Sequence, residues 1–255
     1  MSINSVNQAT YTSEEGVNAY LTTTLQSPEI SIFVKYKDFY YSKKILDIGC
    51  GTGRTSFYFR NFTNDYLGVD YSESMIRKSK KCYPELEFQH CDARDLSRFK
   101  DCSFDFIIFS YNGIDYISNN DRLAVLKEIK RILKDDGMFV FSTHNRTFSN
   151  IETTPSFQFS LNPVNFTRNL LGYFKQLINN SKLKNEKIET EDYAILNDSG
   201  NNFSLLTYYI SKEKQIEQLR KVGFNMQEMF DMNGQVLNKK DNDSNNAWIY
   251  YVTTK

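Results

Sequence analysis

Residues 44–59 read KILDIGCGTGRTSFYF, and this stretch decides the fold. A short apolar run is followed by three glycines at alternate positions, Gly49, Gly51 and Gly53. Glycines placed after a strand in this way allow a cofactor to lie close to the backbone. The spacing is not that of a dinucleotide fingerprint, because the third glycine would fall at Arg54 or Ser56. A phosphate-binding G-x-x-x-x-G-K-[ST] motif is also absent, so the stretch predicts a cofactor that has no diphosphate to be clasped.

Apolar strands alternate with helical patterns along the first half of the chain. Strands are expected at 44–49, 66–70, 86–90, 104–110 and 138–143, and helices at 54–62, 72–83 and 121–133. The segment 134–137 is expected to close the last of these helices, with Gly137 in the C-cap region. This alternation predicts an α/β fold, a mostly parallel Rossmann-like sheet with helices on both faces. The carboxyl ends of its strands then share one edge, where ligands gather.

The alternation stops after Thr143. Residues 144–210 show no clean period, except that LLTYYIS at 205–211 predicts a strand with Tyr208 and Tyr209 on opposite faces. A helix at 211–223 and strands at 224–229 and 247–253 then resume the pattern. We therefore expect an N-terminal helical lid or substrate segment (1–43), a cofactor-binding core (44–143), an α+β insertion for the substrate (144–210) and a completion of the core sheet (211–255).

Composition limits the class of partner. The chain is 40% hydrophobic and 24% charged, so it can build a large core. Basic and acidic residues balance at 31 each, which gives no overall reason to expect nucleic acid or an anionic membrane as partner. The N-terminus lacks a signal-peptide pattern, and the apolar runs are too short to cross a bilayer. The four cysteines have no metal-ligand spacing, so we expect reduced thiols, no metal site and a cytoplasmic protein.

Acidic residues follow the second and third strands. Asp70 stands at the end of the second strand, where a carboxylate can accept hydrogen bonds from both ribose hydroxyls. Asp92 comes just beyond the third strand, where it could meet an adenine edge. A turn or cap role is the alternative for Asp92.

Five motifs occur in order on the expected elements: LDIGCGTGR (46–54), GVDYSESM (68–75), CDARDL (91–96), FDFIIFSYNGIDYI (104–117) and KEIKRILKDDGMFVFST (127–143). Together they resemble the class I S-adenosylmethionine-dependent methyltransferases of small molecules. The resemblance covers residues 44–143 and, more loosely, 211–255. It implies a seven-stranded sheet whose last strand is antiparallel, S-adenosylmethionine as cofactor and S-adenosylhomocysteine as product.

The resemblance also implies roles for individual residues. The backbone lies close to the methionine and ribose portions of the cofactor at Gly49, Gly51 and Gly53. Asp70 holds the ribose diol. Asp92 and Ala93 lie at the adenine, with Tyr71 or Met75 on its face, although ordinary helix packing is the alternative for these two. The remaining residues at the methionine end are the loop residues Asp47 and Arg54 and the backbone of Ser110 and Tyr111. Asp47 organises the loop and the cofactor's amino group, unless it bonds loop amides alone.

Methyl transfer to an alcohol needs a base, because the alcohol's pKa is far above neutrality, whereas a neutral amine already has a lone pair. Of the two histidines, His90 is interpreted as structural or cofactor-adjacent. His144 ends the fifth strand on the ligand edge, so it is the candidate base or substrate-orienting group, with a capping role as the alternative. Asn112 and Asn145 are candidates for positioning a polar acceptor, and Tyr111 and Tyr116 for lining its pocket.

The acceptor itself is predicted only by class. In the resembling family, the N-terminal segment and the insertion recognise the substrate. The first contains Tyr11 and Tyr20, which would fold over the cofactor as a lid or simply pack within the protein. The second contains five basic residues, which would meet an anionic acceptor or simply form a solvated helix face (Arg168, Lys175, Lys182, Lys184 and Lys187). No proline follows the fourth strand, where protein and nucleic-acid N-methyltransferases often carry an Asp/Asn-Pro-Pro motif.

We therefore expect O-methylation of a small molecule, sugar-like or phosphorylated, as in bacterial carbohydrate or secondary-metabolite biosynthesis. N-methylation of an amino sugar or other small amine is the first alternative. A non-catalytic cofactor-binding regulator is the second. A monomer or a homodimer is expected.

Overall fold

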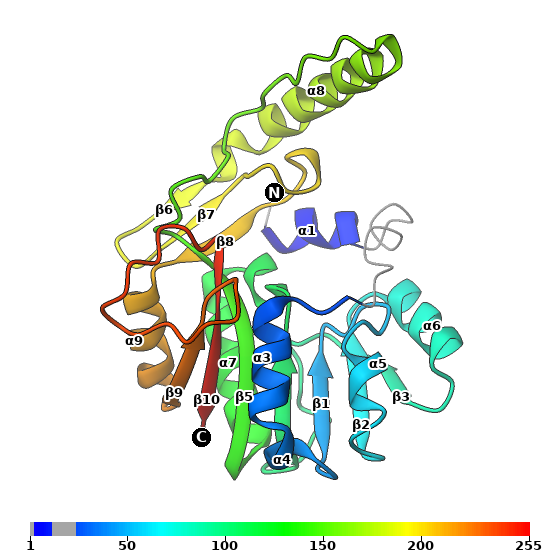
Figure 1. Ribbon diagram of the computed structural model, residues 1–255, viewed down its shortest axis with the longest axis vertical. Coiled ribbons are helices and arrows are strands. Elements are labelled where there is room, and N and C mark those ends of the chain that lie inside the picture. The colour runs from blue at the N-terminus through cyan, green and yellow to red at the C-terminus, as the bar shows by residue number, and fades with distance from the viewer. Residues whose placement is uncertain (1–2, 12–23) are drawn as a thin grey trace.

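The computed structural model describes residues 3–11 and 24–255, and it forms three layers, with a central sheet between helices on either face (Figure 1). Seven strands make up the core of the sheet in the order β3-β2-β1-β4-β5-β10-β9. Their bounds are β1 Ile45–Ile48, β2 Tyr66–Asp70, β3 Glu87–His90, β4 Phe104–Phe109, β5 Leu133–Asn145, β9 Asn225–Phe230 and β10 Trp248–Thr254. Strands β1 to β5 are parallel, and β10 is antiparallel to both β5 and β9. This confirms the predicted mostly parallel sheet with an antiparallel last strand.

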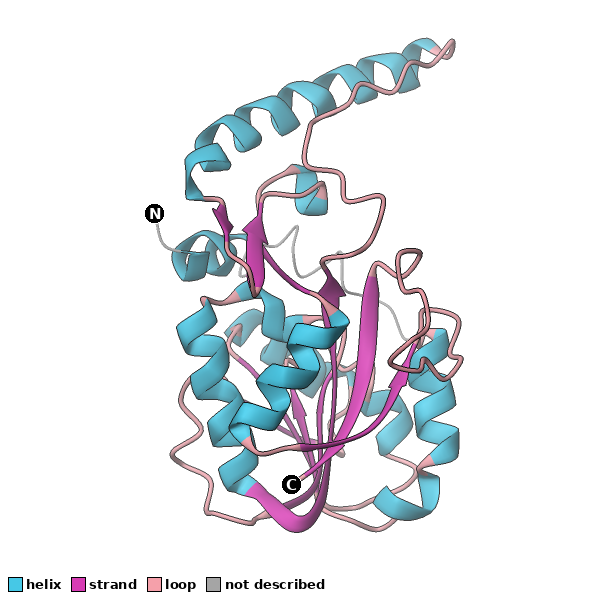
Figure 2. Ribbon diagram, turned by 90° about the vertical axis from the view of Figure 1, so that its left-hand side faces the viewer, coloured by secondary structure: helices cyan, strands magenta, loops and turns pink. Residues whose placement is uncertain are grey.

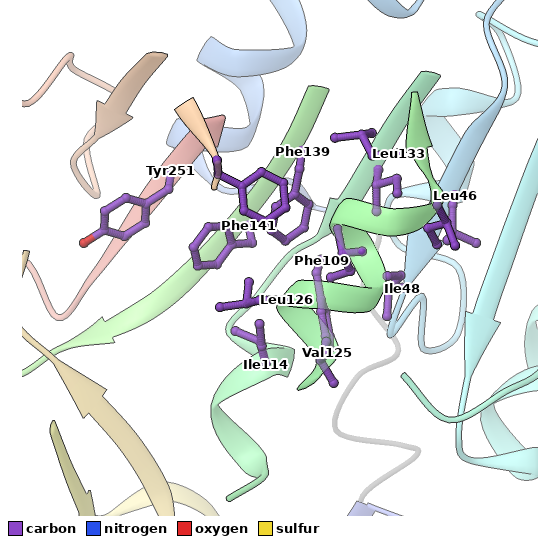
Figure 3. Close-up of a cluster of buried hydrophobic side chains, with 14 of the residues drawn as sticks. Leu46, Ile48, Phe109, Ile114, Val125, Leu126, Leu133, Phe139, Phe141 and Tyr251 are labelled. Atoms are coloured by element: carbon purple, nitrogen blue, oxygen red, sulfur yellow. The ribbon is translucent and has the colours of Figure 1, made fainter. Parts of the chain in front are cut away.

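The two faces of the sheet bury different apolar clusters, because neighbouring strand residues point to opposite faces. Ile45 and Phe106 pack with α3, α4, α5 and α6, whereas Leu46 and Ile107 pack with α7 and α9. Figure 3 shows part of the second cluster, where α7 side chains meet Phe139 and Phe141 of β5. The helix bounds are α3 Ser27–Lys35, α4 Lys37–Tyr40, α5 Ser56–Phe59, α6 Glu73–Cys82, α7 Asn119–Ile132 and α9 Lys212–Val222.

The junction between α7 and β5 differs from the sequence prediction. The helix ends at Ile132, and β5 starts at once with Leu133, so the segment 134–137 belongs to the strand and Gly137 is not a C-cap. A capping glycine is not needed here, because the backbone N–H groups of Cys102 and Ser103 donate to the carbonyls of Arg131 and Ile132. The helix predicted at 54–62 is likewise shorter, with only Ser56–Phe59 in α-helical geometry.

The insertion extends the sheet rather than forming a separate body. Its strands are β6 Ile188–Glu189, β7 Tyr193–Leu196 and β8 Thr207–Ile210. β8 pairs in parallel with the end of β5 at His144 and Asn145, and β7 and β6 follow in antiparallel order. In the described part of the chain, the sheet therefore has ten strands. The predicted strand at 205–211 is confirmed as β8, and the predicted helix ending near Gly223 is confirmed as α9.

A long helix, α8 (Pro163–Leu183), precedes β6 and projects from the body of the molecule (Figures 1 and 2). The sequence showed no clean period here, so this 21-residue helix is a correction. Its start is well marked, because the Asn162 side chain accepts hydrogen bonds from the N–H groups of Val164 and Asn165, and Pro163 occupies the first turn. Among the described residues, no helix has both the length and the apolar character needed to cross a bilayer.

Candidate active site

A cavity of about 180 Å³ opens at the carboxyl edge of the parallel strands, where ligands bind in folds of this class. Its lining comes from the loops after β1, β2, β3 and β4 and from α1 (Ile3–Tyr11). The predicted cofactor residues in the lining are Asp47, Gly49, Gly51, Arg54, Asp70, Tyr71, Met75, Asp92, Ala93, Ser110 and Tyr111. Gly53, Asn112, His144 and Asn145 are not in the lining. The fold therefore gathers the predicted cofactor residues but leaves most of the predicted catalytic residues outside the cavity.

Two glycines of the loop have different reasons to be glycine. Both adopt positive φ, +56° at Gly51 and +95° at Gly53. A Cβ on Gly51 would meet nothing within 4 Å, and this residue lines the cavity. A Cβ on Gly53 would lie 2.6 Å from the ring of Tyr83. Gly51 thus keeps space open for a ligand, whereas Gly53, predicted as a cofactor residue, is required by the packing of Tyr83.

Asp47 is buried behind the loop. Its carboxylate accepts hydrogen bonds from the hydroxyls of Thr55 at 2.5 Å and Tyr66 at 2.8 Å. Burial raises the pKa of Asp47 to about 6, although these two hydrogen bonds oppose the rise. The side chain bonds hydroxyls within the protein rather than the loop amides that the sequence suggested as its alternative partners.

Asp70 links the glycine loop to the start of α6. One carboxylate oxygen accepts from the N–H of Gly51 at 3.0 Å, and the other accepts from the N–H of Ser72 at 2.8 Å. Burial raises the pKa of Asp70 to about 6, again against the effect of its hydrogen bonds. Each oxygen retains a further lone pair, so the carboxylate can still accept from a ligand hydroxyl.

Asp92 and Arg94 form an ion pair at the far end of the cavity, 2.5 Å apart between Oδ2 and a guanidinium nitrogen. Partial burial raises the pKa of Asp92, but the hydrogen bonds and charge of Arg94 outweigh it and hold the pKa below its usual value. Asp92 also accepts from the backbone N–H of Arg94, as the predicted alternative of a turn residue requires. His90 lies outside the cavity, with Nε2 2.8 Å from the carbonyl oxygen of Tyr71.

A buried carboxylate from α3 ties the N-terminal segment to the loop. Glu29 is 1% exposed, and Arg54 contacts it through two guanidinium nitrogens at 2.5 and 2.7 Å. The hydroxyls of Ser110 and Tyr250 also donate to Glu29. Burial raises the pKa of Glu29, yet Arg54 and the hydroxyl of Ser110 hold the net value below normal. The side chains of Arg54 and Ser110 therefore have structural partners besides any cofactor.

Beside the cavity, His144 and Asp115 form a hydrogen-bonded pair. Nδ1 of His144 lies 2.7 Å from the carboxylate of Asp115, which also accepts from the backbone N–H of His144. The other carboxylate oxygen contacts Arg122 at 2.5 Å and accepts from the hydroxyl of Thr143 at 2.6 Å. Asp115 and Arg122 are fully buried, whereas the His144 side chain is 13% exposed. This carboxylate fixes the orientation of the imidazole.

Sequence reasoning missed both Glu29 and Asp115. They stand in SPEISIFVKY (27–36) and SYNGIDYI (110–117), and neither segment has a pattern that marks a buried carboxylate. Their partners are 25 and 29 residues away along the chain. A contact of that range is set by the fold, so a single sequence offered no signal for it.

The two asparagines predicted to position an acceptor have different environments. The Asn145 amide donates to the carbonyls of Asp243 and Asn246, and its oxygen accepts from the backbone and hydroxyl of Thr147. Asn145 therefore holds a loop and is corrected to a structural residue. Asn112 is 4% exposed, and its side-chain oxygen has no hydrogen-bond partner among residues 3–11 and 24–255, while its amide nitrogen lies 3.4 Å from Nε2 of His144.

Aromatic rings from three parts of the chain surround His144. Ring centroids lie 5.2 Å away for Tyr209, 6.1 Å for Trp248 and 6.2 Å for Tyr116. Tyr111 lies next to Trp248, with 6.4 Å between centroids, and contacts the guanidinium of Arg54. Tyr111 and Tyr116 also line the cavity. Tyr111, Tyr116, Tyr209 and Trp248 are together called the aromatic wall, which runs from the cavity lining to His144.

Helix α1 closes another part of the cavity. Asn7 donates to the carbonyls of Tyr116 and Leu206 and accepts from the N–H of Leu206, which fixes the helix to the insertion and to the loop after β4. Asn4, Asn7 and Gln8 belong to the lining. That this helix acts as a lid stays a prediction. Of the two predicted lid tyrosines, Tyr20 and the side chain of Tyr11 lie outside the described residues.

The residues of the cavity fit S-adenosylmethionine. Gly51 leaves open space where a side chain would stand, and Asp70 presents a buried carboxylate that can accept from a ribose. Tyr71, Met75 and Ala93 supply apolar surface for a purine ring. In the described part of the chain, no group of three His, Cys, Asp or Glu side chains could hold a metal ion.

Comparison with known proteins agrees with this fit. Residues 45–137 match the methyltransferase domain family. A demethylmenaquinone methyltransferase of Staphylococcus saprophyticus is 36% identical over 104 residues, which cover 38% of this chain and 42% of that protein. The methyltransferase YcgJ of Bacillus subtilis is 27% identical over 124 residues, which cover 47% of each chain. This chain thus matches less than half the length of these curated relatives.

Solved structures extend the likeness of fold to almost the whole chain. PH0226 of Pyrococcus horikoshii covers 96% of this chain and is itself covered to 93%, at 22% identity and a TM-score of 0.55. A Burkholderia thailandensis 1,6-didemethyltoxoflavin-N1-methyltransferase, with S-adenosylhomocysteine bound, covers 99% and is covered to 87%, at 12% identity and a TM-score of 0.61. The chain therefore contains a methyltransferase domain at residues 45–137, in the fold of the class I methyltransferases that use S-adenosylmethionine as their cofactor.

Proposed function

We propose that this protein transfers a methyl group from S-adenosylmethionine to a hydroxyl of a small molecule, with His144 as the general base. The observation that supports it most is the 2.7 Å contact between Nδ1 of His144 and Asp115. The bound cofactor supplies the electrophilic methyl group, so the protein has to position the acceptor and remove one proton.

The Asp115 carboxylate determines which nitrogen of His144 can act. It accepts at Nδ1, so the proton of the neutral imidazole resides there and Nε2 keeps its lone pair. Nε2 lies 3.4 Å from the amide nitrogen of Asn112. Because a hydrogen bond of this length is weak, the hydroxyl of an acceptor can replace it at Nε2. Arg122 and Thr143 keep the Asp115 carboxylate in place while His144 takes up the proton.

The surroundings of His144 favour an uncharged, ring-shaped acceptor. The aromatic wall of Tyr111, Tyr116, Tyr209 and Trp248 offers ring faces for stacking, and the orphan oxygen of Asn112 offers an acceptor for a hydroxyl. Both guanidinium groups of the cavity lining, on Arg54 and Arg94, already pair with carboxylates.

Of the two predicted acceptor classes, a sugar-like molecule suits this lining better than a phosphorylated one. The basic residues that were predicted to meet an anionic acceptor are not in the cavity lining. The demethylmenaquinone named for one relative is a further acceptor to test. Oligomeric state and cytoplasmic location stay predictions.

The test combines binding and turnover. Isothermal titration should show S-adenosylhomocysteine binding to the purified protein. Transfer of labelled methyl to a panel of glycosides, phenols and matched amines should then identify a hydroxyl acceptor. His144→Ala and His144→Gln should each lower kcat about 10²–10⁴-fold, as expected for loss of a general base, while cofactor-product affinity stays within twofold.

The glutamine variant separates catalysis from structure. Its amide can still donate to Asp115, so full activity of His144→Gln would mean that His144 only holds the site together. Unchanged turnover of both variants between pH 6 and 9 would contradict the base assignment and favour the amine alternative. Failure to bind S-adenosylhomocysteine would contradict the proposed function as a whole.

A further inference from the structure

The part of the insertion formed by residues 151–183, called here the arm, is attached to the body at one end only. Close to the C-terminal end of α8, Asn179 donates to the carbonyl of Asn202 and Asn180 to the side chain of Asn197. Leu183, the last residue of α8, is the only buried residue of the helix. The rest of α8 extends away from the sheet, as Figures 1 and 2 both show.

The extended segment before α8 covers one side of the helix. Phe157 packs on Phe166 and Tyr173, with ring centroids 5.7 and 5.8 Å apart, and Phe159 packs on Phe166 at 6.0 Å. Asn169 donates to the carbonyl of Gln158 and holds the extended segment against the helix. This side of α8 therefore has its apolar partner within the arm.

A second apolar side of α8 has no cover within the described residues. Val164, Leu171, Phe174 and Ile178 follow helical spacing and lie on one face, with exposed fractions of 75, 66, 53 and 56%. Leu161, just before the helix, is 91% exposed. Val164, Leu171, Phe174 and Ile178, with Leu161 before the helix, are together called the arm stripe. An exposed stripe of this kind marks a surface that is covered by something else.

The charges beside the stripe indicate what covers it. Arg168 and Lys175 lie along one edge of the stripe at helical spacing, Lys182 follows on the same edge, and all three are exposed. No Asp or Glu occurs between residues 153 and 185. The chain as a whole has no net charge, but this segment has only basic and apolar or uncharged polar side chains. This combination complements a surface that is apolar inside and anionic outside.

A second copy of the arm does not offer such a surface. Two arm stripes packed face to face would bring the basic edges of both helices into one interface with no acidic residue to pair them. Arg168 and Lys175 in the middle of α8 also favour a helix that lies on a bilayer over one that crosses it. We propose that the arm docks on an anionic membrane surface, with the arm stripe inserted at the headgroup boundary and the basic edge on the headgroups.

Vesicle co-sedimentation tests this proposal with the full-length protein. Vesicles of phosphatidylcholine with about 30% phosphatidylglycerol should bind the protein, and pure phosphatidylcholine should bind it at least tenfold more weakly. Raising NaCl from about 0.05 to 0.5 M should weaken binding, because the basic edge is screened. Leu171→Ser with Phe174→Ser, and separately Arg168→Glu with Lys175→Glu, should each reduce the partition coefficient at least tenfold.

Matched controls come from exposed residues of other helices. Val34→Ser removes an apolar side chain that is 73% exposed on α3, and Lys80→Glu with Lys81→Glu reverses two exposed charges on α6. Both controls should bind vesicles like the parent. Circular dichroism and S-adenosylhomocysteine titration of every variant should match the parent, since the arm does not line the cavity.

Three outcomes would overturn the proposal. One is binding that the arm variants and the control variants weaken equally. Another is equal binding to neutral and anionic vesicles. The third is no vesicle binding together with a dimer in light scattering that Leu171→Ser with Phe174→Ser converts to a monomer, which would make a second copy the occupant of the stripe. Because cofactor binding is measured separately, failure of this proposal leaves the proposed methyl transfer standing.

Discussion

At the scale of single residues, Asp70 connects the loop, α6 and the proposed ribose site. Its carboxylate is held by two backbone N–H groups, and burial raises its pKa to about 6. Since the folded pKa lies above the ordinary 3.8, the folded chain binds this proton more tightly than the unfolded chain. The contribution of Asp70 to stability therefore falls as the pH rises from 3.8 to about 6. This loss of stability arises because the carboxylate is buried, where a ligand can reach it.

Cofactor binding should have the opposite dependence on pH. A protonated Asp70 offers fewer acceptor sites, so S-adenosylhomocysteine affinity should fall about tenfold between pH 7.5 and pH 5. Asp70→Ala should weaken binding at pH 7.5 by about 1–3 kcal/mol, as expected for the loss of a charge-assisted hydrogen bond. Isothermal titration of Asp70→Asn, whose side chain does not titrate, should give a flat profile below pH 7. A profile of Asp70→Asn equal to that of the parent would exclude Asp70 as the titrating ligand group.

The two glycines of the loop should respond differently to the same change. In Gly51→Ala the new methyl group points into the cavity, so cofactor-product affinity should fall while positive φ costs about 1–2 kcal/mol of stability. Gly53→Ala should lose about 1–3 kcal/mol more stability than Gly51→Ala, because its Cβ overlaps the Tyr83 ring. Urea unfolding and isothermal titration measure the two effects. Tyr83→Leu in the Gly53→Ala background should recover part of the stability, and the reverse ranking of the two variants would contradict this assignment.

At the scale of elements, α3 is attached to the glycine loop by a buried ion pair. The Glu29 and Arg54 side chains are 0 and 12% exposed, and removing one partner leaves the other charge without compensation. Glu29→Ala should therefore lower the free energy of unfolding by about 3–5 kcal/mol in urea titration. The effect should shrink as the pH falls below 4.5, since a lowered pKa gives stability that is lost on protonation.

An exposed pair provides the control for this prediction. Glu73 on α6 pairs with Arg77, and their side chains are 68 and 71% exposed. Glu73→Ala should therefore cost less than about 1 kcal/mol. A further variant with Glu29→Leu and Arg54→Met should recover much of the lost stability, because no buried charge is left unpaired. Equal losses for Glu29→Ala and Glu73→Ala would mean that the pair does not hold α3.

Elements also differ in how well the sequence predicts them. The predicted core strands from 44–49 to 104–110 coincide with β1 to β4 within one or two residues, because their apolar runs have the strand period and clear boundaries. The predicted end of α7 was wrong. Gly137 suggested a C-cap, but the backbone N–H groups of Cys102 and Ser103 bind the last carbonyls of the helix instead. Helix α8 was missed because its apolar arc is broad and interrupted by asparagines.

At the scale of the whole molecule, the chain combines a core sheet with an extension grown from the end of β5. Pairing of His144 with Tyr209 and of Asn145 with Ile210 joins the two parts. This junction also brings Tyr209 against the candidate base and leaves α8 projecting from the far side of the extension (Figure 1). The same insertion therefore contributes to the aromatic wall and carries the arm.

The sequence by itself determined the parallel sheet and most of the residues that line the cavity. Strand periodicity and the motifs at the ends of successive strands are local, and parallel strands bring their carboxyl ends to one edge wherever they pair. Gly51, Asp70, Asp92 and Ser110 thus reach the cavity as predicted. Only the tertiary structure decided that Asp115 orients His144, that Glu29 binds Arg54, that Asn145 holds a loop and that the arm stripe has no cover. These depend on contacts between residues far apart in the chain, and apolar periodicity indicates which face of a helix is apolar but not what packs against it.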